Sequence, residues 1–260
     1  MDLLTVIILG IVEGITEFLP VSSTGHLILT SWLLKIPQSE FLKTFEIAIQ
    51  LGAILAVVVL YWRPLILDRE MIKKVALAFM PTVFIGFMFY KTIKSFFLGN
   101  TYIVIWSLLI GGIFIVIFEL WYRAKSKVNQ SVAHISYSHA FLIGVFQSLA
   151  MIPGVSRSAA TIIAGLMLGI NRKKIVEFSF LLAVPTMFSA VTLDLVKSAK
   201  LFTYGYFTYL FIGSVVSFLT AMLAIKFLLA FIKNNSFIPF GIYRIILALL
   251  FFVLVILPLH

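Results

Sequence analysis

Two glutamates near the start of the chain stand where acids are rare. Glu13 and Glu17 lie inside an apolar segment, and no basic residue is close to them in the sequence. If lipid surrounds that segment, each charge costs roughly 2.5–3.5 kcal/mol or more at the bilayer centre. A spacing of four places both carboxyl groups on one helix face. We therefore expect a paired-carboxylate site for metal binding, proton transfer or both; the structural alternative is that both acids are protonated or cap the next turn.

A single arginine has the complementary position in the second half of the chain. Arg157 lies in a break between two apolar segments, whereas every other arginine lies at or near the end of an apolar run. Its planar guanidinium matches the oxygens of a phosphate group. We interpret Arg157 as an anion clamp. The structural alternative is a counter-ion for Glu13 or Glu17, and both roles can hold at once.

Hydroxyl side chains gather in and directly after the two breaks, at 20–26 and 153–158. We expect these hydroxyls and the free backbone N–H groups of the turns to bind phosphate, as helix N-termini do. For any single hydroxyl, simple N-capping is the alternative. Two such turns in corresponding places, one with an arginine, favour an anion site. The candidates are Ser22, Ser23, Thr24, Ser156, Ser158 and Thr161.

His26 follows the first turn. A lone histidine is more often a packed residue than a catalyst, but the nearby glutamates and hydroxyls favour a catalytic role here. The other histidines, His134, His139 and His260, have no supporting cluster. The phosphate-loop pattern GxxxxGK[ST] and the zinc pattern HExxH are absent from the sequence.

The composition requires a lipid environment for these residues. Of 260 residues, 62% are apolar and only 12% are charged, against about 45–50% and about 25% in soluble proteins. Lipid permits helices or a closed barrel, and the long, unalternated apolar runs favour helices. The net charge of +10 belongs to short gaps between runs, where it meets lipid headgroups, so no nucleic-acid partner is expected. The absence of cysteine excludes disulfides.

The apolar runs predict an all-α polytopic membrane protein with six spanning helices plus two re-entrant helical hairpins. Regions 3–34 and 140–170 are the hairpins, because each is broken in the middle and its arms are short for a full span. Non-helical backbone at membrane depth is tolerated where protein or a water-filled cavity surrounds it. The six spanning runs are 44–62, 75–90, 101–122, 175–196, 204–232 and 239–258.

Loop charges predict the orientation of the chain. Loops 63–74, 123–139 and 171–174 carry three or four basic residues each, so the positive-inside rule places them in the cytoplasm. This placement of the loops requires that segment 140–170 enters and leaves the membrane on the cytoplasmic side. It also requires that segment 3–34 enters and leaves on the outer side. Both termini are then expected outside.

An internal repeat agrees with this orientation. A shift of 134 residues aligns the two broken regions, and the predicted topology turns one copy upside down. We therefore divide the single membrane domain 1–260 into a first inverted repeat, 1–122, and a second, 140–258. Inverted repeats with broken helices place the functional site at their interface. Aligned pairs include Gly10 and Gly144, Glu13 and Gln147, and Ser22 and Ser156.

Both breaks resemble signatures of a known family. The runs EGITEFLPVSSTGH at 13–26 and PGVSRS at 153–158 look like the two signatures of the undecaprenyl-pyrophosphate phosphatase family linked to bacitracin resistance. The similarity continues through 49–56, 178–182 and 243–244, so it covers essentially the whole chain. One departure is an alanine at 159, where a glycine is usual.

The resemblance implies hydrolysis of undecaprenyl diphosphate to undecaprenyl phosphate and inorganic phosphate. The carrier then re-enters peptidoglycan synthesis, which confers bacitracin resistance. It also implies a divalent cation and a multi-pass protein of the bacterial inner membrane, with its site open to the extracytoplasmic side. Residues matching the family's functional positions are Glu13, Glu17, Ser23, His26 and Arg157, with Ser22, Thr24, Ser156 and Thr161 in support.

The mechanism implied by this match leaves alternatives open. Mg²⁺ or Ca²⁺ bound by Glu13 and Glu17 would offset the repulsion between the carboxylates and a diphosphate. The attacking group is Ser23, which we favour, or a water activated by Glu17, with His26 as base or acid. The expected partners are a prenyl diphosphate lipid and the membrane, and a homodimer is one option for the oligomeric state. The rival function is a transporter or flippase of prenyl phosphate lipid, because inverted repeats also build transporters.

Overall fold

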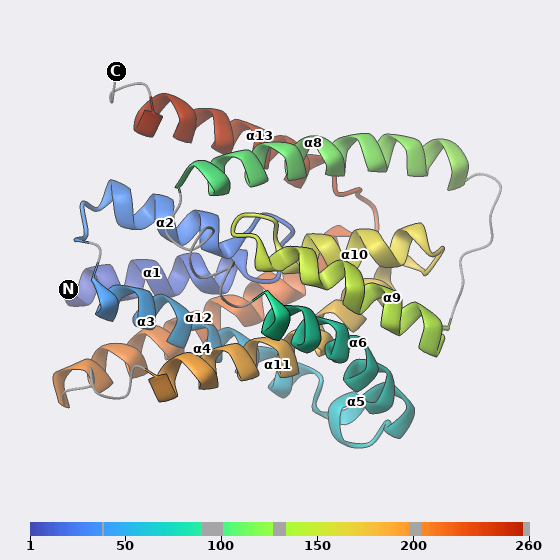
Figure 1. The fold of residues 1–260 in the computed structure, drawn as a ribbon, viewed down its shortest axis with the longest axis horizontal. Helices are drawn as coiled ribbons and strands as arrows, with labels where there is room; N and C mark the ends of the chain where they lie inside the picture. Colours follow the sequence, from blue (N-terminus) through green and yellow to red (C-terminus); the bar gives the residue numbers. More distant parts are fainter. Residues whose placement is uncertain (38, 90–100, 127–133, 198–203, 257–260) are drawn as a thin grey trace.

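The structure is a computed structural model that describes residues 1–37, 39–89, 101–126, 134–197 and 204–256. These residues are almost entirely helical (Figure 1). In chain order the elements are α1 Leu3–Thr16, α2 Ser23–Leu33, α3 Glu40–Ala48, α4 Gln50–Leu60, α5 Trp62–Ile66, α6 Arg69–Met88, α8 Thr101–Ser126, α9 Tyr137–Gln147, the 3₁₀ turn η2 Ser148–Met151, α10 Arg157–Met167, α11 Arg172–Lys197, α12 Tyr204–Phe231, α13 Ile238–Phe251 and the π-helical turn η4 Phe252–Ile256.

Polar caps explain where several helices begin. In each case a side-chain oxygen accepts a hydrogen bond from the backbone N–H three residues later, which satisfies one of the free donors of the first turn. The capping residues are Asp2 for α1, Ser39 for α3, Asp68 for α6 and Ser136 for α9.

Within the described residues, five helical segments are long and apolar enough to cross a membrane. They correspond to the first five predicted spans, so an all-helical polytopic membrane protein is confirmed. The sixth run, 239–258, forms the shorter apolar segment Ile238–Leu254, and its last residues lie outside the described part of the chain. A full sixth span stays a prediction. The five segments are Glu40–Leu60, Arg69–Met88, Thr101–Ala124, Arg172–Lys197 and Phe207–Phe231.

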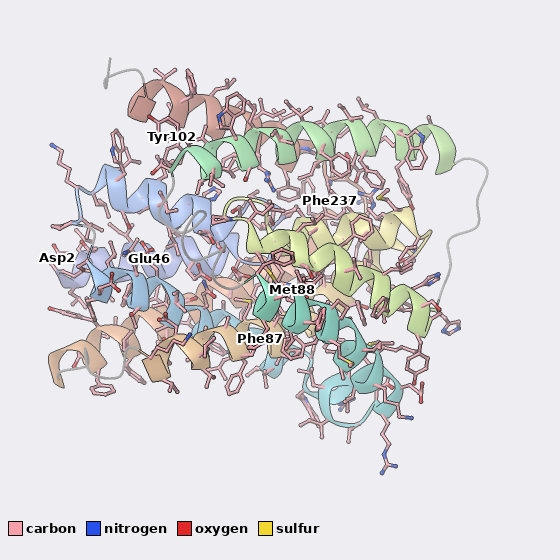
Figure 2. The ribbon with its side chains drawn as sticks, in the orientation of Figure 1. Asp2, Glu46, Phe87, Met88, Tyr102 and Phe237 are labelled. Atoms are coloured by element: carbon pink, nitrogen blue, oxygen red, sulfur yellow. The ribbon has the colours of Figure 1, made fainter. Side chains whose placement is uncertain are left out.

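Side-chain exposure is inverted relative to a soluble protein. Phe87 and Met88, labelled at the end of α6 in Figure 2, are 86% and 66% exposed. In contrast, Glu13, Glu119 and Arg244 are fully buried. Apolar side chains on the outside and ionisable ones on the inside are what a lipid surrounding selects, because buried charges can then find polar partners.

The two broken regions are hairpins of short helices. Figure 1 shows α1 and α2 extending to one end of the molecule and α9 and α10 to the other, with both connecting turns near the middle. The 14 residues of α1 extend about 21 Å and the 11 of α10 about 17 Å, at about 1.5 Å per residue. Neither length matches a hydrocarbon core of about 30 Å.

The first arm of each hairpin packs against a long helix from the other half of the chain. Helix α1 packs on α12, and α9 packs on α6. A glycine permits each close approach: a Cβ at Gly10 would lie 2.8 Å from the carbonyl oxygen of Gly213, and one at Gly144 would overlap the backbone of Ala78. Gly10 and Gly144 are a pair aligned by the sequence repeat. The inverted repeat stays a prediction, and these matched packing roles agree with it.

A buried ion pair ties α8 to α11. Arg172 donates to both carboxylate oxygens of Glu119, at 2.6 Å and 3.0 Å, and the backbone N–H of Phe237 also donates to Glu119 at 3.1 Å. The guanidinium of Arg172 lies 4.9 Å from the ring centre of Phe237, which is labelled in Figure 2. The pair connects α8, α11 and the start of α13, and removal of either partner would leave the other charge buried and unpaired, which is destabilising.

Candidate active site

Glu17 connects the two hairpins. It follows directly after α1, and its Oε2 accepts a hydrogen bond of 2.6 Å from the hydroxyl of Ser23, the first residue of α2. Its Oε1 contacts Nη2 and Nε of Arg157, the first residue of α10, at 3.4 Å and 3.5 Å. The side chains of Glu17 and Arg157 are only 8% and 10% exposed. The two predicted groups of opposite charge therefore meet, although 140 residues separate them.

Arg157 keeps part of its donor capacity. Besides its contacts with Glu17, its Nη1 donates to the carbonyl of Ser179 on α11 at 2.8 Å, and its guanidinium lies 5.8 Å from the ring centre of Phe18. An arginine carries five N–H groups, and these contacts engage three of them. The other two N–H groups have no hydrogen-bond partner among the described residues and could donate to an anion.

Glu13 is the unsatisfied member of the acid pair. It is fully buried one helical turn before Glu17, and neither of its carboxylate oxygens has a hydrogen-bond partner among the described residues. The charges of Glu17, Glu46 and Arg157 all act on it. A buried carboxylate without a partner is costly, so this position favours a further positive group.

The acid pair fits an oxygen-liganded cation with open positions. Within the described ranges, no three His, Cys, Asp or Glu side chains gather as a complete ligand set. Mg²⁺ commonly takes one or two carboxylates and completes its coordination with water and substrate phosphate. The free oxygens of Glu13 beside Glu17 suit that arrangement. The expected cation, Mg²⁺ or Ca²⁺, stays a prediction.

His26 is held by two partners on different elements. Its Nδ1 lies 2.7 Å from the carbonyl oxygen of Ser22, and its Nε2 lies 2.8 Å from the hydroxyl of Tyr243 on α13. The rings of His26 and Tyr243 are stacked, with centres 5.5 Å apart. Because a carbonyl only accepts, the proton is on Nδ1, and in the neutral ring Nε2 accepts from Tyr243.

Tyr243→Phe should lower kcat about threefold to tenfold. The hydroxyl orients His26, and a neutral hydrogen bond contributes roughly 0.5–1.5 kcal/mol, while 1.36 kcal/mol corresponds to about tenfold in rate. Steady-state kinetics of the phosphate release that the family resemblance implies would measure the effect. The control is the double variant with His26→Ala, which should be no slower than His26→Ala alone, because Tyr243 acts through His26. Multiplying losses would show that Tyr243 acts independently.

The second arm of each hairpin begins with the same unusual serine geometry. Ser22 and Ser156 have φ values of 74° and 73°, in the left-handed region that non-glycine residues rarely adopt. Each serine caps its helix: Ser22 accepts from the N–H of Gly25 at 3.4 Å, and Ser156 from that of Ala159 at 3.3 Å. The capping alternative therefore holds for both. Such strained residues persist where surrounding contacts fix them, commonly at functional sites.

The remaining candidate hydroxyls differ in their access. Ser158 and Thr161 are fully buried and occupied: Ser158 donates to the carbonyl of Leu19 at 2.8 Å, and Thr161 lies 2.6 Å from the hydroxyl of Ser179. They brace the second turn against the first turn and α11. Thr24, in contrast, is exposed. Phosphate binding by Ser158 and Thr161 stays a prediction, and of these three hydroxyls Thr24 is the accessible one.

Sequence reasoning missed three residues around the site. Tyr243 contacts His26 directly. Glu46, labelled on α3 in Figure 2, accepts a hydrogen bond of 2.8 Å from the hydroxyl of Ser31. Arg244 was expected near the end of an apolar run, but it is fully buried and its guanidinium reaches both turns. The adjacent polar pair Tyr243–Arg244 inside an apolar run is the sequence signal that could have indicated α13.

The fold and the site together define a class of protein: a multi-pass helical membrane protein with a charged site built from two broken hairpins in its interior. A family model described as bacitracin resistance protein BacA matches residues 6–250. The chain belongs to this family.

Three relatives named undecaprenyl-diphosphatase are similar to the chain over nearly its whole length. The protein of Sulfurihydrogenibium sp. (strain YO3AOP1) is 55% identical over 252 residues, covering 97% of this chain and 99% of the relative. The protein of Aquifex aeolicus (strain VF5) is 53% identical, covering 94% and 95%. The protein of Wolinella succinogenes is 52% identical, covering 96% and 97%. The family resemblance indicated by the sequence is therefore confirmed.

Proposed function

We propose that the protein hydrolyses undecaprenyl diphosphate to undecaprenyl phosphate and inorganic phosphate, which recycles the lipid carrier for peptidoglycan synthesis and confers bacitracin resistance. One observation carries this proposal: Glu17 contacts Ser23 from one hairpin and Arg157 from the other. These three side chains meet at a buried point, where Glu17, Ser23 and Arg157 are suited to act as base, nucleophile and anion clamp, respectively. The names of the relatives support the same substrate.

Ser23 is the favoured nucleophile because its hydroxyl already donates to Glu17 at 2.6 Å. Its Oγ attacks the terminal phosphorus while its proton passes to Glu17. A new P–O bond forms, the bond between that phosphorus and the bridging oxygen breaks, and undecaprenyl phosphate leaves. Water then attacks the phosphoserine, which releases inorganic phosphate and restores Ser23. In the alternative, Glu17 activates a water that attacks directly.

Positive charge and backbone donors stabilise the phosphoryl oxygens. The two N–H groups of Arg157 that have no partner among the described residues can donate to them, and positioning with charge stabilisation dominates phosphoryl transfer. A divalent cation held by Glu13 and Glu17 would supply further charge neutralisation at the phosphate. His26, held by Ser22 and Tyr243, serves as base or as acid for the leaving phosphate; to act as the acid, its Nε2 must first gain a proton.

We also propose the arrangement in the membrane that the sequence predicts. The two hairpins are re-entrant, the chain forms two inverted repeats, 1–122 and 140–258, and the site opens to the extracytoplasmic side of the bacterial inner membrane. The short arms of α1 and α10 and the turns near the middle of the molecule support re-entrance (Figure 1). The prenyl tail then stays in the bilayer while the headgroup enters. A homodimer stays a prediction.

Purified protein in detergent separates an enzyme from a lipid transporter. Detergent micelles have no two sides, so transport alone yields no product. We expect release of inorganic phosphate from undecaprenyl diphosphate that is lost on chelation of divalent cations and restored by Mg²⁺ or Ca²⁺. Absence of phosphate release from folded protein under these conditions would favour the transporter.

Ser23→Ala should reduce phosphate release about 10³-fold or more and abolish a trappable phosphoenzyme. The wild-type protein should yield an acid-stable phosphoserine in rapid-quench experiments with substrate labelled in the terminal phosphate. Thr24→Ala is the matched control, since its hydroxyl is adjacent but has no contact with Glu17, and it should still form the phosphoenzyme. If Ser23→Ala retains most activity and no phosphoenzyme accumulates, water is the nucleophile.

A further inference from the structure

Arg244 makes an unusual set of contacts behind the two turns. Its guanidinium is fully buried and donates to five backbone carbonyls. Two belong to α8, one to the first turn and two to the second turn. The acceptors are Leu108 at 3.4 Å, Ser107 at 2.9 Å, Pro20 at 3.5 Å, Val155 at 3.0 Å and Gly154 at 2.8 Å.

These contacts use the whole donor capacity of the side chain. A guanidinium has five N–H groups, and the pattern of one bond from Nε and two from each Nη accounts for all of them. None of the acceptors is a carboxylate. Arg244 therefore differs from Arg157, which keeps two N–H groups and a partly exposed side chain. With no exposed surface and no free donor, Arg244 does not bind substrate.

Glycines on three elements form the slot that Arg244 occupies. A Cβ at Gly111 on α8 would overlap the guanidinium itself. Gly112 and Gly241 allow α8 and α13 to pack closely, because a Cβ on either would lie 2.8 Å from the carbonyl oxygen of the other. Gly154, at φ 92°, lets the second turn approach α8, where a Cβ would lie 2.8 Å from the carbonyl oxygen of Val104.

The bonds of Arg244 also fix the orientation of peptide groups at the site. The C=O and N–H of a trans peptide point in opposite directions. Because the carbonyl of Val155 points to Arg244, the N–H of Ser156, directly before Arg157, points away from it. Ser22 and Ser156 both have strained backbones, and such conformations persist only when their surroundings fix them. Arg244 binds the carbonyl immediately before Ser156 and, in the first turn, the carbonyl of Pro20.

We propose that Arg244 is a positioning residue that fastens both hairpin turns to α8 and so holds Ser23 and Arg157 in one arrangement. The proposal deepens the proposed function, because it concerns how that site is assembled. A purely structural arginine would stabilise the protein without a particular effect on turnover, so the two readings differ in what Arg244→Lys does to the folded enzyme.

The experiment compares Arg244→Lys with Arg172→Lys in purified full-length protein. Lysine keeps the charge but has three N–H groups instead of five. We expect Arg244→Lys to lower kcat about 100-fold with KM changed less than about threefold. Arg172→Lys, in the buried pair with Glu119, should lower the melting temperature while kcat per folded molecule stays within about twofold. If Arg244→Lys keeps kcat within threefold, or if both variants lose activity in proportion to stability, the proposal is overturned.

A second readout does not depend on catalysis. The chain contains no cysteine, so two cysteines introduced by substitution can carry thiol-specific spin labels without background. Suitable positions are Trp32 of α2 and Met167 of α10, which are 43% and 50% exposed. We expect a narrow distance distribution between the labels, broadened by Arg244→Lys and unchanged by Arg172→Lys. Equal widths in all three proteins would overturn the proposal.

Both readouts keep the test decisive when one variant fails. If Arg244→Lys does not fold, Gly111→Ala keeps the arginine but displaces its guanidinium from the slot, and we expect it to lower kcat and broaden the distance distribution in the same way. If the wild-type protein releases no phosphate, the proposed function fails, and the spin-label distances still decide the role of Arg244.

Discussion

Replacing Glu17 with glutamine should reduce phosphate release about 10³-fold or more. The amide has nearly the same shape, but it cannot take a proton from Ser23, whose hydroxyl donates to Glu17 at 2.6 Å. General-base catalysis alone contributes about 10²–10⁴-fold. The substitution also removes the negative charge that faces Arg157. The measurement is kcat for phosphate release in detergent, normalised to folded protein.

Glu46→Gln is the matched control for that variant. Glu46 is another largely buried acid on a neighbouring helix, but its hydrogen bond is to Ser31, and glutamine can keep that bond. We expect its kcat to stay within about threefold of the wild-type value. Glu17→Gln with more than a few per cent of wild-type activity would contradict the role of Glu17 as base.

Replacing Arg157 with alanine should lower kcat/KM about 10³-fold. The change removes the donors available to phosphate, and arginines that stabilise phosphoryl transfer typically contribute about 10³–10⁵-fold. It also leaves Glu17 buried beside the unpaired Glu13, so the folded protein should become less stable. Kinetics and thermal unfolding of the same preparation separate the two effects.

Arg157→Lys distinguishes charge from geometry. Lysine restores a positive charge but lacks the planar fork, so we expect it to recover stability more than activity, with kcat/KM about 10–100-fold below the wild-type value. The bridging role of Arg157 would be contradicted if alanine and lysine gave the same kinetics, or if alanine cost less than about tenfold.

The membrane class and the two hairpins could be predicted because their signals are local. Long apolar runs indicate helices in lipid, and the polar breaks around Ser22 and Ser156 indicate turns. The inward positions of Glu13, Glu17 and Arg157 also follow from local context, since a charge inside an apolar run must face the protein interior. The predicted last span, 239–258, corresponds to the shorter apolar helix Ile238–Leu254 within the described residues.

The partners of these side chains could not be predicted, because they depend on contacts between distant segments. Tyr243 contacts His26 across 217 positions, and Arg244 contacts Pro20 across 224. Local sequence gave no reason to prefer these pairs, because the polar pair Tyr243–Arg244 inside an apolar run indicates an inward-facing position but not which residues it contacts. Glycines at 111, 112 and 241 leave the space that Arg244 and the packing of α8 against α13 require. The sequence alone does not show which residue packs against a given glycine.

The amino-acid sequence by itself determined that this chain is helical, lies in lipid and has two polar turns. It also determined that the first hairpin carries two glutamates and the second carries an arginine. The tertiary structure decided that Glu17 bridges Ser23 and Arg157 and that α13 supplies Tyr243 and Arg244. It also decided that the carboxylate of Glu13 has no hydrogen-bond partner among the described residues. The physical reason is that lipid solvation acts on each segment separately, whereas hydrogen bonding among buried polar groups is settled only when the helices pack together.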